Sequence, residues 1–99
     1  MPYTVKLEPE AVRDIQEAID WYNQQRPSLG QAFYKKLDVD FEILKTYPHF
    51  QVRYDAVRCL PVKKFPYMIH YTLDEKNKTV IIRAVLSTHR NPDIWKQRP

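Results

Sequence analysis

The stretch YMIHYTLDEKNKTVIIRAVLS, residues 67–87, decides the fold. Apolar and polar side chains alternate over residues 67–74 and again over residues 80–87, and this two-residue period is typical of half-buried β-strands. The polar residues 74–78 between them are of the kinds that form tight connections between neighbouring strands. The stretch therefore predicts a β-hairpin.

Two further strands are predicted upstream of this hairpin. Residues 3–8 alternate over a short run, and residues 57–64 form a longer strand-like segment. Pro61 lies inside the longer segment. Because proline has no N–H to donate to a neighbouring strand, this strand is confined to a sheet edge or a bulge.

The segment between residues 9 and 26 predicts an amphipathic helix. Pro9 suits the first turn of a helix, and the helix should end before Pro27, because a proline disfavours helical geometry in the residue ahead of it. The expected buried stripe consists of Val12, Ile15, Ile19 and Tyr22, widened by Ala11, Ala18 and Trp21. The expected solvated side consists of Arg13, Asp14, Glu17 and Asp20.

A second helix is predicted from Ser28 to Tyr47. Ser28 and Gln31 have the spacing of a capping box, in which each side chain bonds the backbone of the other residue. The expected buried face is Phe33, Leu37, Phe41 and Leu44, and the expected solvated faces are Lys35, Lys36, Asp38, Asp40, Glu42 and Lys45. The connection between the two helices is so short that they must fold back as an antiparallel hairpin.

The element order is β-α-α-β-β-β. It predicts an α+β fold in which the helix hairpin packs on one face of an antiparallel sheet. Ninety-nine residues are enough for one two-layer core, so we expect residues 1–99 to form a single domain.

Composition excludes several classes of protein. The single cysteine, Cys59, rules out an internal disulfide framework and is typical of a reducing cytosol. The one glycine argues against a Gly-rich phosphate loop, and no apolar run approaches the roughly 18 residues of a membrane span. Residues 1–3 open no signal peptide, and His49, His70 and His89 lack the short spacings of metal ligands. We expect a cytoplasmic protein without membrane contact, metal or cofactor.

Charge is divided unevenly along the chain. Residues 1–50 hold six Lys/Arg and eight Asp/Glu, a net charge of −2, whereas residues 51–99 hold ten and four, a net charge of +6. Such an imbalance indicates an anionic ligand or an acidic partner. The candidate partner-binding residues are Arg58, Lys63, Lys64, His70, Arg83 and Arg90. An alternative for Arg58 and Arg83 is pairing with acidic residues of the chain itself.

Five groups of residues follow one known pattern. The first helix contains Ala11-x-x-Asp14-Ile15-x-x-Ala18-x-x-Trp21-Tyr22, and the second opens with Leu29-Gly30-x-x-Phe33. Downstream come Ile43-x-x-x-x-Pro48, Arg58-x-x-x-x-x-x-Phe65-Pro66-Tyr67-x-Ile69-x-Tyr71 and Ile82-x-Ala84-Val85-x-x-x-x-Arg90-x-Pro92-x-x-Trp95. In this order, over almost the whole chain, they resemble the RelE/ParE superfamily of bacterial toxins from type II toxin–antitoxin systems.

The resemblance implies a small cytosolic toxin that a cognate antitoxin holds inactive. RelE-like members cut messenger RNA on the ribosome without metal, and ParE-like members inhibit DNA gyrase by binding. RelE-like cleavage uses lysines on the first strand of the meander, an arginine on the next strand, and an arginine with a tyrosine near the C-terminus. Lys63 and Lys64 match the lysines, but Met68 occupies the arginine position and Trp95 the tyrosine position. These departures favour the ParE-like branch.

Three interpretations follow from the resemblance. The first is a non-enzymatic inhibitor of DNA gyrase. The second is a metal-independent endonuclease that acts on messenger RNA at the ribosome, and the third is a family member that binds its antitoxin but inhibits nothing. For the nuclease, the catalytic residues would be His89, Arg90, Lys63, Lys64 and Arg83.

The properties of the chain also predict what kind of antitoxin binds it. A small basic domain with edge strands suits an acidic, partly disordered segment that folds on binding, so that a toxin–antitoxin hetero-oligomer forms.

Overall fold

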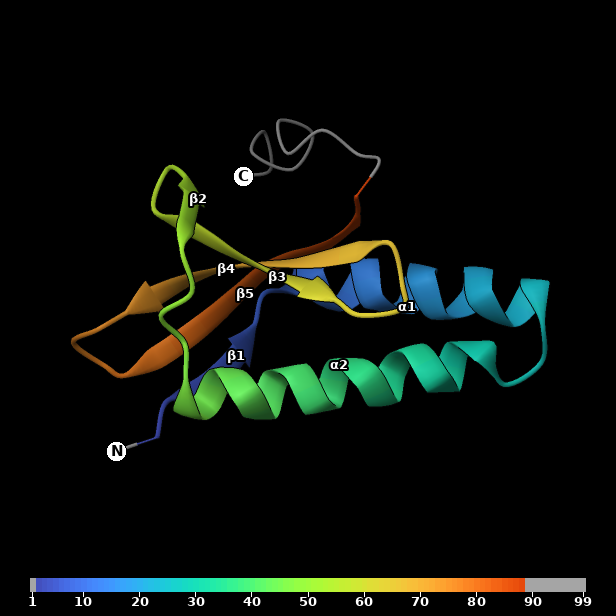
Figure 1. Ribbon diagram of the computed structural model, residues 1–99, viewed down its shortest axis with the longest axis horizontal. Helices are drawn as coiled ribbons and strands as arrows, with labels where there is room; N and C mark the ends of the chain where they lie inside the picture. The colour runs from blue at the N-terminus through green and yellow to red at the C-terminus, as the bar shows by residue number, and fades with distance from the viewer. Residues whose placement is uncertain (1, 89–99) are drawn as a thin grey trace.

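A five-stranded sheet carries two helices on one face (Figure 1). The computed structural model describes residues 2–88. The described elements follow the order β1 (Thr4–Leu7), α1 (Pro9–Gln25), α2 (Leu29–Thr46), β2 (Val52–Tyr54), β3 (Val57–Val62), β4 (Tyr67–Asp74) and β5 (Thr79–Ser87). The predicted α+β fold with a helix hairpin on a sheet is confirmed, and β2 is an additional short strand.

The strands lie side by side in the order β1-β5-β4-β3-β2. Three of the four pairings are antiparallel, whereas β1 runs parallel to β5 with Thr4 opposite Thr79 and Leu7 opposite Ile82. The first strand therefore joins the sheet beside the last described strand, and β5 lies between β1 and β4. The helix hairpin is the connection that carries the chain from β1 across the sheet.

Pro61 occupies the kind of position that the sequence predicts. β2 pairs with β3 only near Val57 and Arg58, and its register shifts between Val52 and Tyr54. No described strand lies along the outer edge of β3 from Cys59 to Val62. A proline is tolerated there because no neighbouring strand requires its missing N–H.

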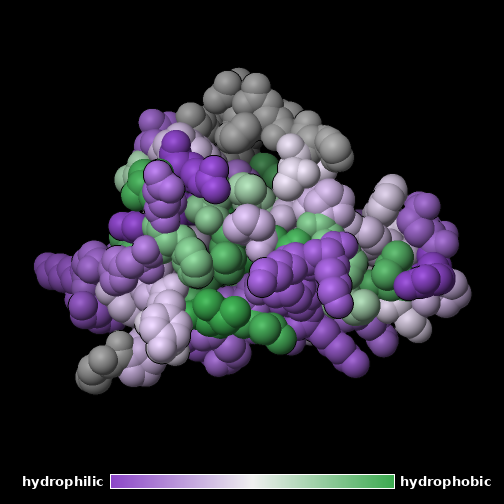
Figure 2. Space-filling model, in the orientation of Figure 1, coloured by the Kyte–Doolittle hydropathy of each residue, from purple (hydrophilic) through white to green (hydrophobic). Residues whose placement is uncertain are grey.

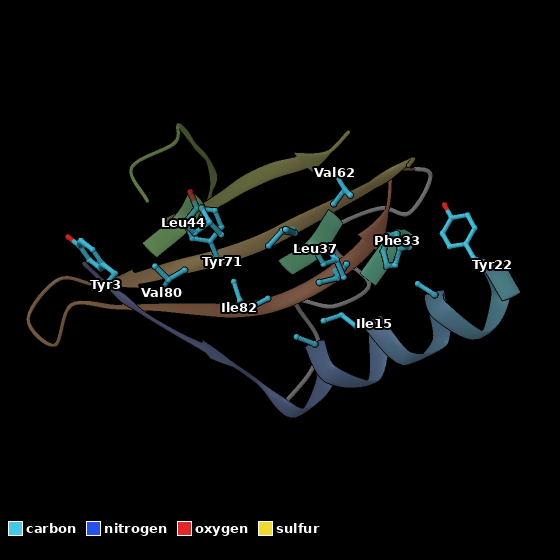
Figure 3. Packing of buried hydrophobic residues seen from close by; sticks show 14 residues of the cluster. Tyr3, Ile15, Tyr22, Phe33, Leu37, Leu44, Val62, Tyr71, Val80 and Ile82 are labelled. Atoms are coloured by element: carbon cyan, nitrogen blue, oxygen red, sulfur yellow. The ribbon is translucent and has the colours of Figure 1, made fainter. Parts of the chain in front are cut away.

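The core lies between the helices and the facing side of the sheet (Figure 3). From α1 it takes Ala11, Ile15, Ala18 and Tyr22, and from α2 Phe33, Leu37 and Leu44. From the sheet it takes Val62, Ile69, Tyr71, Val80, Ile82 and Val85. The predicted burial of Val12 and Trp21 is wrong, since these side chains are 53% and 51% exposed. The apolar stripe of α1 is thus narrower than its count of apolar residues indicates.

Two acidic residues expected on solvated faces are buried. Asp14 is 7% exposed, and its Oδ2 accepts the backbone N–H of Val85 at 3.1 Å. Asp40 is 2% exposed and forms an ion pair with Lys36 one turn earlier on α2. Each carboxylate tolerates burial because a donor faces it, which is the usual condition for a buried charge.

The turn between the helices differs from the predicted capping box. Ser28 has a left-handed backbone (φ 72°) and makes no side-chain capping bond. Asn23 of α1 instead accepts the N–H of Gly30 with its Oδ1 at 2.9 Å, so a side chain from the neighbouring helix satisfies the start of α2. A Cβ on Gly30 would lie 2.5 Å from the carbonyl oxygen of Ile19, which shows how closely the helices approach.

Neither described helix combines the length and the apolar character that a membrane span requires.

Candidate functional site

Lys63 and Lys64 lie exposed in the turn between β3 and β4. Lys64 has a left-handed backbone (φ 72°), and the turn is closed by the N–H of Phe65, which donates to the carbonyl of Val62 at 3.2 Å. The ring of Phe65 packs edge-on against Tyr22 and Phe33, with centroids 5.2 and 5.1 Å away. The lysine pair is therefore carried by a turn that is anchored to both helices.

Arg83 pairs with an acidic residue of the chain, as the alternative prediction has it, whereas the described partner of Arg58 is a backbone carbonyl. Arg58 donates to the backbone carbonyl of Phe50. Arg83 donates to Glu8 Oε1 at 2.8 Å and to Thr72 Oγ1 at 3.1 Å. Both guanidinium groups thus brace loops and helix ends, although each side chain remains partly exposed.

His70 is buried, so the prediction of an exposed, partner-contacting imidazole is wrong. It lies between Ile69 and Tyr71 and points to the opposite side of the sheet from these core residues, as the sequence predicts, but it is only 5% exposed. Its Nδ1 lies 2.8 Å from the hydroxyl of Tyr54 and 3.4 Å from Cys59 Sγ. Burial lowers the pKa of His70 to about 4, because the charged imidazolium would lose its hydration.

Among residues 2–88, the predicted cationic residues do not converge on one point. In the register of β3 and β4, Arg58 lies opposite Tyr71 and Val62 lies opposite Tyr67. The turn of Lys63 and Lys64 therefore begins four residues, about 13 Å, along β3 from Arg58. His89, Arg90 and Trp95 lie outside the described residues. Within residues 2–88 no group of His, Cys, Asp and Glu could hold a metal ion.

The helices expose apolar side chains that the core does not use. On α2 these are Val39 and Ile43, and Tyr47 follows at the C-cap, at four-residue steps and 54%, 38% and 70% exposed. Figure 2 shows the resulting hydrophobic surface over α2, bordered by hydrophilic side chains. An apolar stripe of this kind on an otherwise charged helix is typical of an interaction surface.

A pocket of about 480 Å³ opens between α1 and the ends of β4 and β5. It is lined by Asp14, Glu17, Ala18, Trp21, Tyr22, Pro66, Tyr67, Val85, Leu86 and Ser87. The sequence interpretation missed it because it placed Asp14 and Glu17 in solvent and Trp21 in the core. The spacing of Asp14 with Ala11, Ile15 and Ala18 was the available signal, since three- and four-residue steps share one helix face.

Comparison with solved structures identifies the fold as that of toxins from toxin–antitoxin systems. The chain is similar to a chain of the chromosomal ParDE system from P. aeruginosa (14% identity, 86% of this chain and 95% of that chain, TM-score 0.75). It is also similar to a mutant of the E. coli toxin RelE in the free state (12%, 98% and 94%, TM-score 0.74). A third similar structure is the RelBE2 toxin–antitoxin complex from Mycobacterium tuberculosis (22%, 88% and 99%, TM-score 0.61).

A comparison of the amino-acid sequence with protein families shows to which family the chain belongs. The family described as the ParE toxin of the type II toxin–antitoxin system parDE matches residues 5–92. The chain therefore belongs to the ParE toxin family, within the RelE/ParE superfamily. No curated protein sequence matches it.

Proposed function

We propose that this ParE-family chain inhibits DNA gyrase by binding it and is neutralised by a cognate antitoxin. The observation that carries the proposal is the match of the ParE toxin family to residues 5–92. Part of the described architecture also supports a binding role. The exposed stripe of Val39, Ile43 and Tyr47 and the uncovered edge of β3 are surfaces to which a helix and a strand of a partner can add.

A gyrase assay tests the inhibitory activity directly. Purified chain should block supercoiling of a relaxed plasmid by gyrase, and prior addition of the antitoxin from the adjacent gene should restore it. The Asp38→Asn variant, which changes one exposed charge on α2, serves as a control and should inhibit as the wild-type chain does. Full supercoiling at toxin concentrations well above that of gyrase would contradict the proposal.

Ribosome-dependent cleavage of messenger RNA is the second candidate function. The exposed Lys63 and Lys64 favour it, because metal-free cleavage requires fixed cations beside the scissile phosphate. Under this alternative His89, Arg90 and Arg83 complete the site. The Lys63→Ala/Lys64→Ala double variant should then abolish cleavage on programmed ribosomes, whereas intact messenger RNA with the wild-type chain would eliminate the nuclease.

Antitoxin binding is the expectation shared by both functions. Two of the similar solved structures, those of the ParDE system and of the RelBE2 complex, belong to toxin–antitoxin systems. Calorimetry between this chain and the product of the adjacent gene should show a saturable complex. We expect an acidic, partly disordered partner, because Lys63 and Lys64 are exposed on a chain of net charge +4.

A further inference from the structure

Helix α2 has a second apolar side besides the one that packs on the core. Phe33, Leu37 and Leu44 face the core. The second side, which we call the α2 seam, consists of residues at alternating steps of three and four, namely Leu29, Ala32, Lys36, Val39, Ile43 and Thr46. Val39 and Ile43 at its centre are 54% and 38% exposed. This spacing is the heptad pattern by which one helix packs lengthwise against another.

The α2 seam points away from α1. Gly30 marks the side of α2 that touches α1, because a Cβ there would lie 2.5 Å from the carbonyl oxygen of Ile19. Successive residues of an α-helix are about 100° apart, so Ala32 and Ile43 lie about 140–160° around the helix axis from Gly30. A partner helix along the seam therefore leaves the contact between α1 and α2 undisturbed.

The α2 seam is complementary to an antiparallel copy of itself. Its steps of three, four, three, four and three residues read the same in both directions. Reversing one copy therefore keeps the seam in register, with Leu29 opposite Thr46, Ala32 opposite Ile43 and Lys36 opposite Val39. A parallel copy would instead place each Lys36 against the Lys36 of the other chain, where two ammonium groups repel. The single charged residue of the seam thus selects the antiparallel orientation.

The charges on the solvent side of the seam are complementary in the same arrangement. Lys35 and Glu42 lie seven residues apart, so they flank the seam on one side. In the antiparallel pair Lys35 of one copy comes beside Glu42 of the other, and twofold symmetry repeats the contact. The side chain of Glu42 is 70% exposed, and its only described ion pair, with Lys45 at 2.8 Å, leaves it open to a second donor.

A buried carboxylate on the other side of the seam gives independent support. Asp40 is 2% exposed, and Lys36 of the same chain forms an ion pair with its Oδ1. Among residues 2–88, no group donates a hydrogen bond to its Oδ2. In the antiparallel pair the Lys36 of the second copy lies opposite Val39 and next to Asp40, and its ammonium group has three donors. The second copy therefore brings a cation to a carboxylate that this chain satisfies at one oxygen.

We propose that two copies of this chain associate through the α2 seam, as an antiparallel helix pair with twofold symmetry. A second copy is the partner because the seam and the two charge pairs beside it are each complementary to themselves. The inference goes beyond the proposed function and does not depend on it. A single pair of helices forms a small interface, and interfaces below about 1,200 Å² are typical of weak association, so the dimer should dissociate on dilution.

Sedimentation equilibrium of the full chain tests the association. The wild-type chain should pass from monomer to dimer as its concentration rises through the micromolar range. Val39→Lys places a second ammonium group opposite Lys36 and should raise the dissociation constant of the dimer by about 10- to 100-fold. A wild-type chain that stays monomeric at every concentration would overturn the inference. If Val39→Lys then also weakens binding of the antitoxin from the adjacent gene, the seam belongs to the antitoxin and the proposed function stands.

Charge reversal tests the antiparallel arrangement. Glu42→Lys brings two lysines together at each end of the pair and should weaken the dimer about tenfold. The double variant Lys35→Glu/Glu42→Lys exchanges the charges and should restore the wild-type dissociation constant. Asp38→Lys makes the same charge change on an exposed part of α2 away from the seam, and it should leave the dissociation constant unchanged. A double variant that associates no better than Glu42→Lys would overturn the antiparallel pairing, provided that melting temperatures of the diluted variants show retained folding.

Discussion

Burial changes the chemistry of His70. The imidazole accepts or donates at Nδ1 with Tyr54 and lies beside Cys59, whose thiol pKa burial raises. An unperturbed histidine has a pKa of about 6.5, and burial lowers that of His70 to about 4. Between these values the unfolded chain binds a proton at His70 that the folded chain does not bind.

The free energy of unfolding should therefore fall as the solution is acidified. Above about pH 6.5 His70 is neutral in both the folded and the unfolded chain, and the free energy of unfolding is unaffected by this group. As the pH falls towards 4, only the unfolded chain binds the proton, so the free energy of unfolding falls by up to about 3 kcal/mol. Urea unfolding at pH 7.5 and at pH 4.5 measures the loss. The His70→Gln variant should show a smaller loss, and equal losses in the variant and the wild type would contradict the role of His70.

Gly30 is required by the approach of the two helices. In the Gly30→Ala variant the new methyl group would meet the carbonyl oxygen of Ile19 at 2.5 Å and Asn23 Oδ1 at 2.6 Å. Because one of these atoms belongs to the backbone, the helices must separate, and we expect a destabilisation of about 1–3 kcal/mol. Thermal unfolding measures it, with the exposed neighbour Gln31→Ala as control. An unchanged melting temperature of Gly30→Ala would show that the hairpin is adaptable.

At the scale of elements, the turn between β2 and β3 carries backbone strain. Its two residues, Asp55 and Ala56, both have positive φ (44° and 64°), a geometry in which glycine is the usual second residue. Ala56→Gly should stabilise the fold by about 1 kcal/mol, since the left-handed backbone penalises a Cβ. Chemical denaturation should show the gain, and Ala32→Gly on exposed α2 should show a loss instead.

The elements that the sequence predicts well are those in which apolar residues recur with a clear helix or strand period. β4 agrees with its predicted limits, and both helices end near the prolines and aromatic residues expected to stop them. β2 has only three residues, and two contacts hold the segment before it: Tyr71 donates to Pro48 at 2.7 Å, and Arg58 donates to Phe50. The partner residues lie 23 positions from Pro48 and eight from Phe50, outside β2 itself, so the three residues of the strand show too little of a pattern to predict it.

The candidate site was predicted only in part for a related reason. Asp14 and Asp40 were assigned to solvent because they are charged, yet their positions fall on the buried face of each helix. What makes burial tolerable is a donor, the backbone N–H of Val85 on a distant strand for Asp14 and Lys36 one turn earlier on the same helix for Asp40. The strand predicted over residues 57–64 is too long, because β3 ends at Val62 and Lys63 and Lys64 lie in the turn that follows it.

At the scale of the whole molecule, charge should govern how fast the antitoxin associates. The Lys63→Ser/Lys64→Ser variant should reduce the association rate constant at low salt more than the dissociation rate constant changes, because exposed charges act mainly on encounter. Stopped-flow mixing at 50 and 300 mM salt measures both. Lys76→Ser/Lys78→Ser removes the same charge from the opposite end of β4, and an equal slowing there would assign the effect to net charge alone.

The parallel pairing of β1 with β5 has a consequence for synthesis. Thr4–Leu7 emerges from the ribosome before the other described strands, but its neighbour in the sheet is made only after more than seventy further residues. Until Thr79–Ser87 emerges, β1 and β4 have no strand to join them. The five-stranded sheet can therefore be completed only after Thr79–Ser87 has been made, so the pairing of β1 is among the last steps in assembling the described fold.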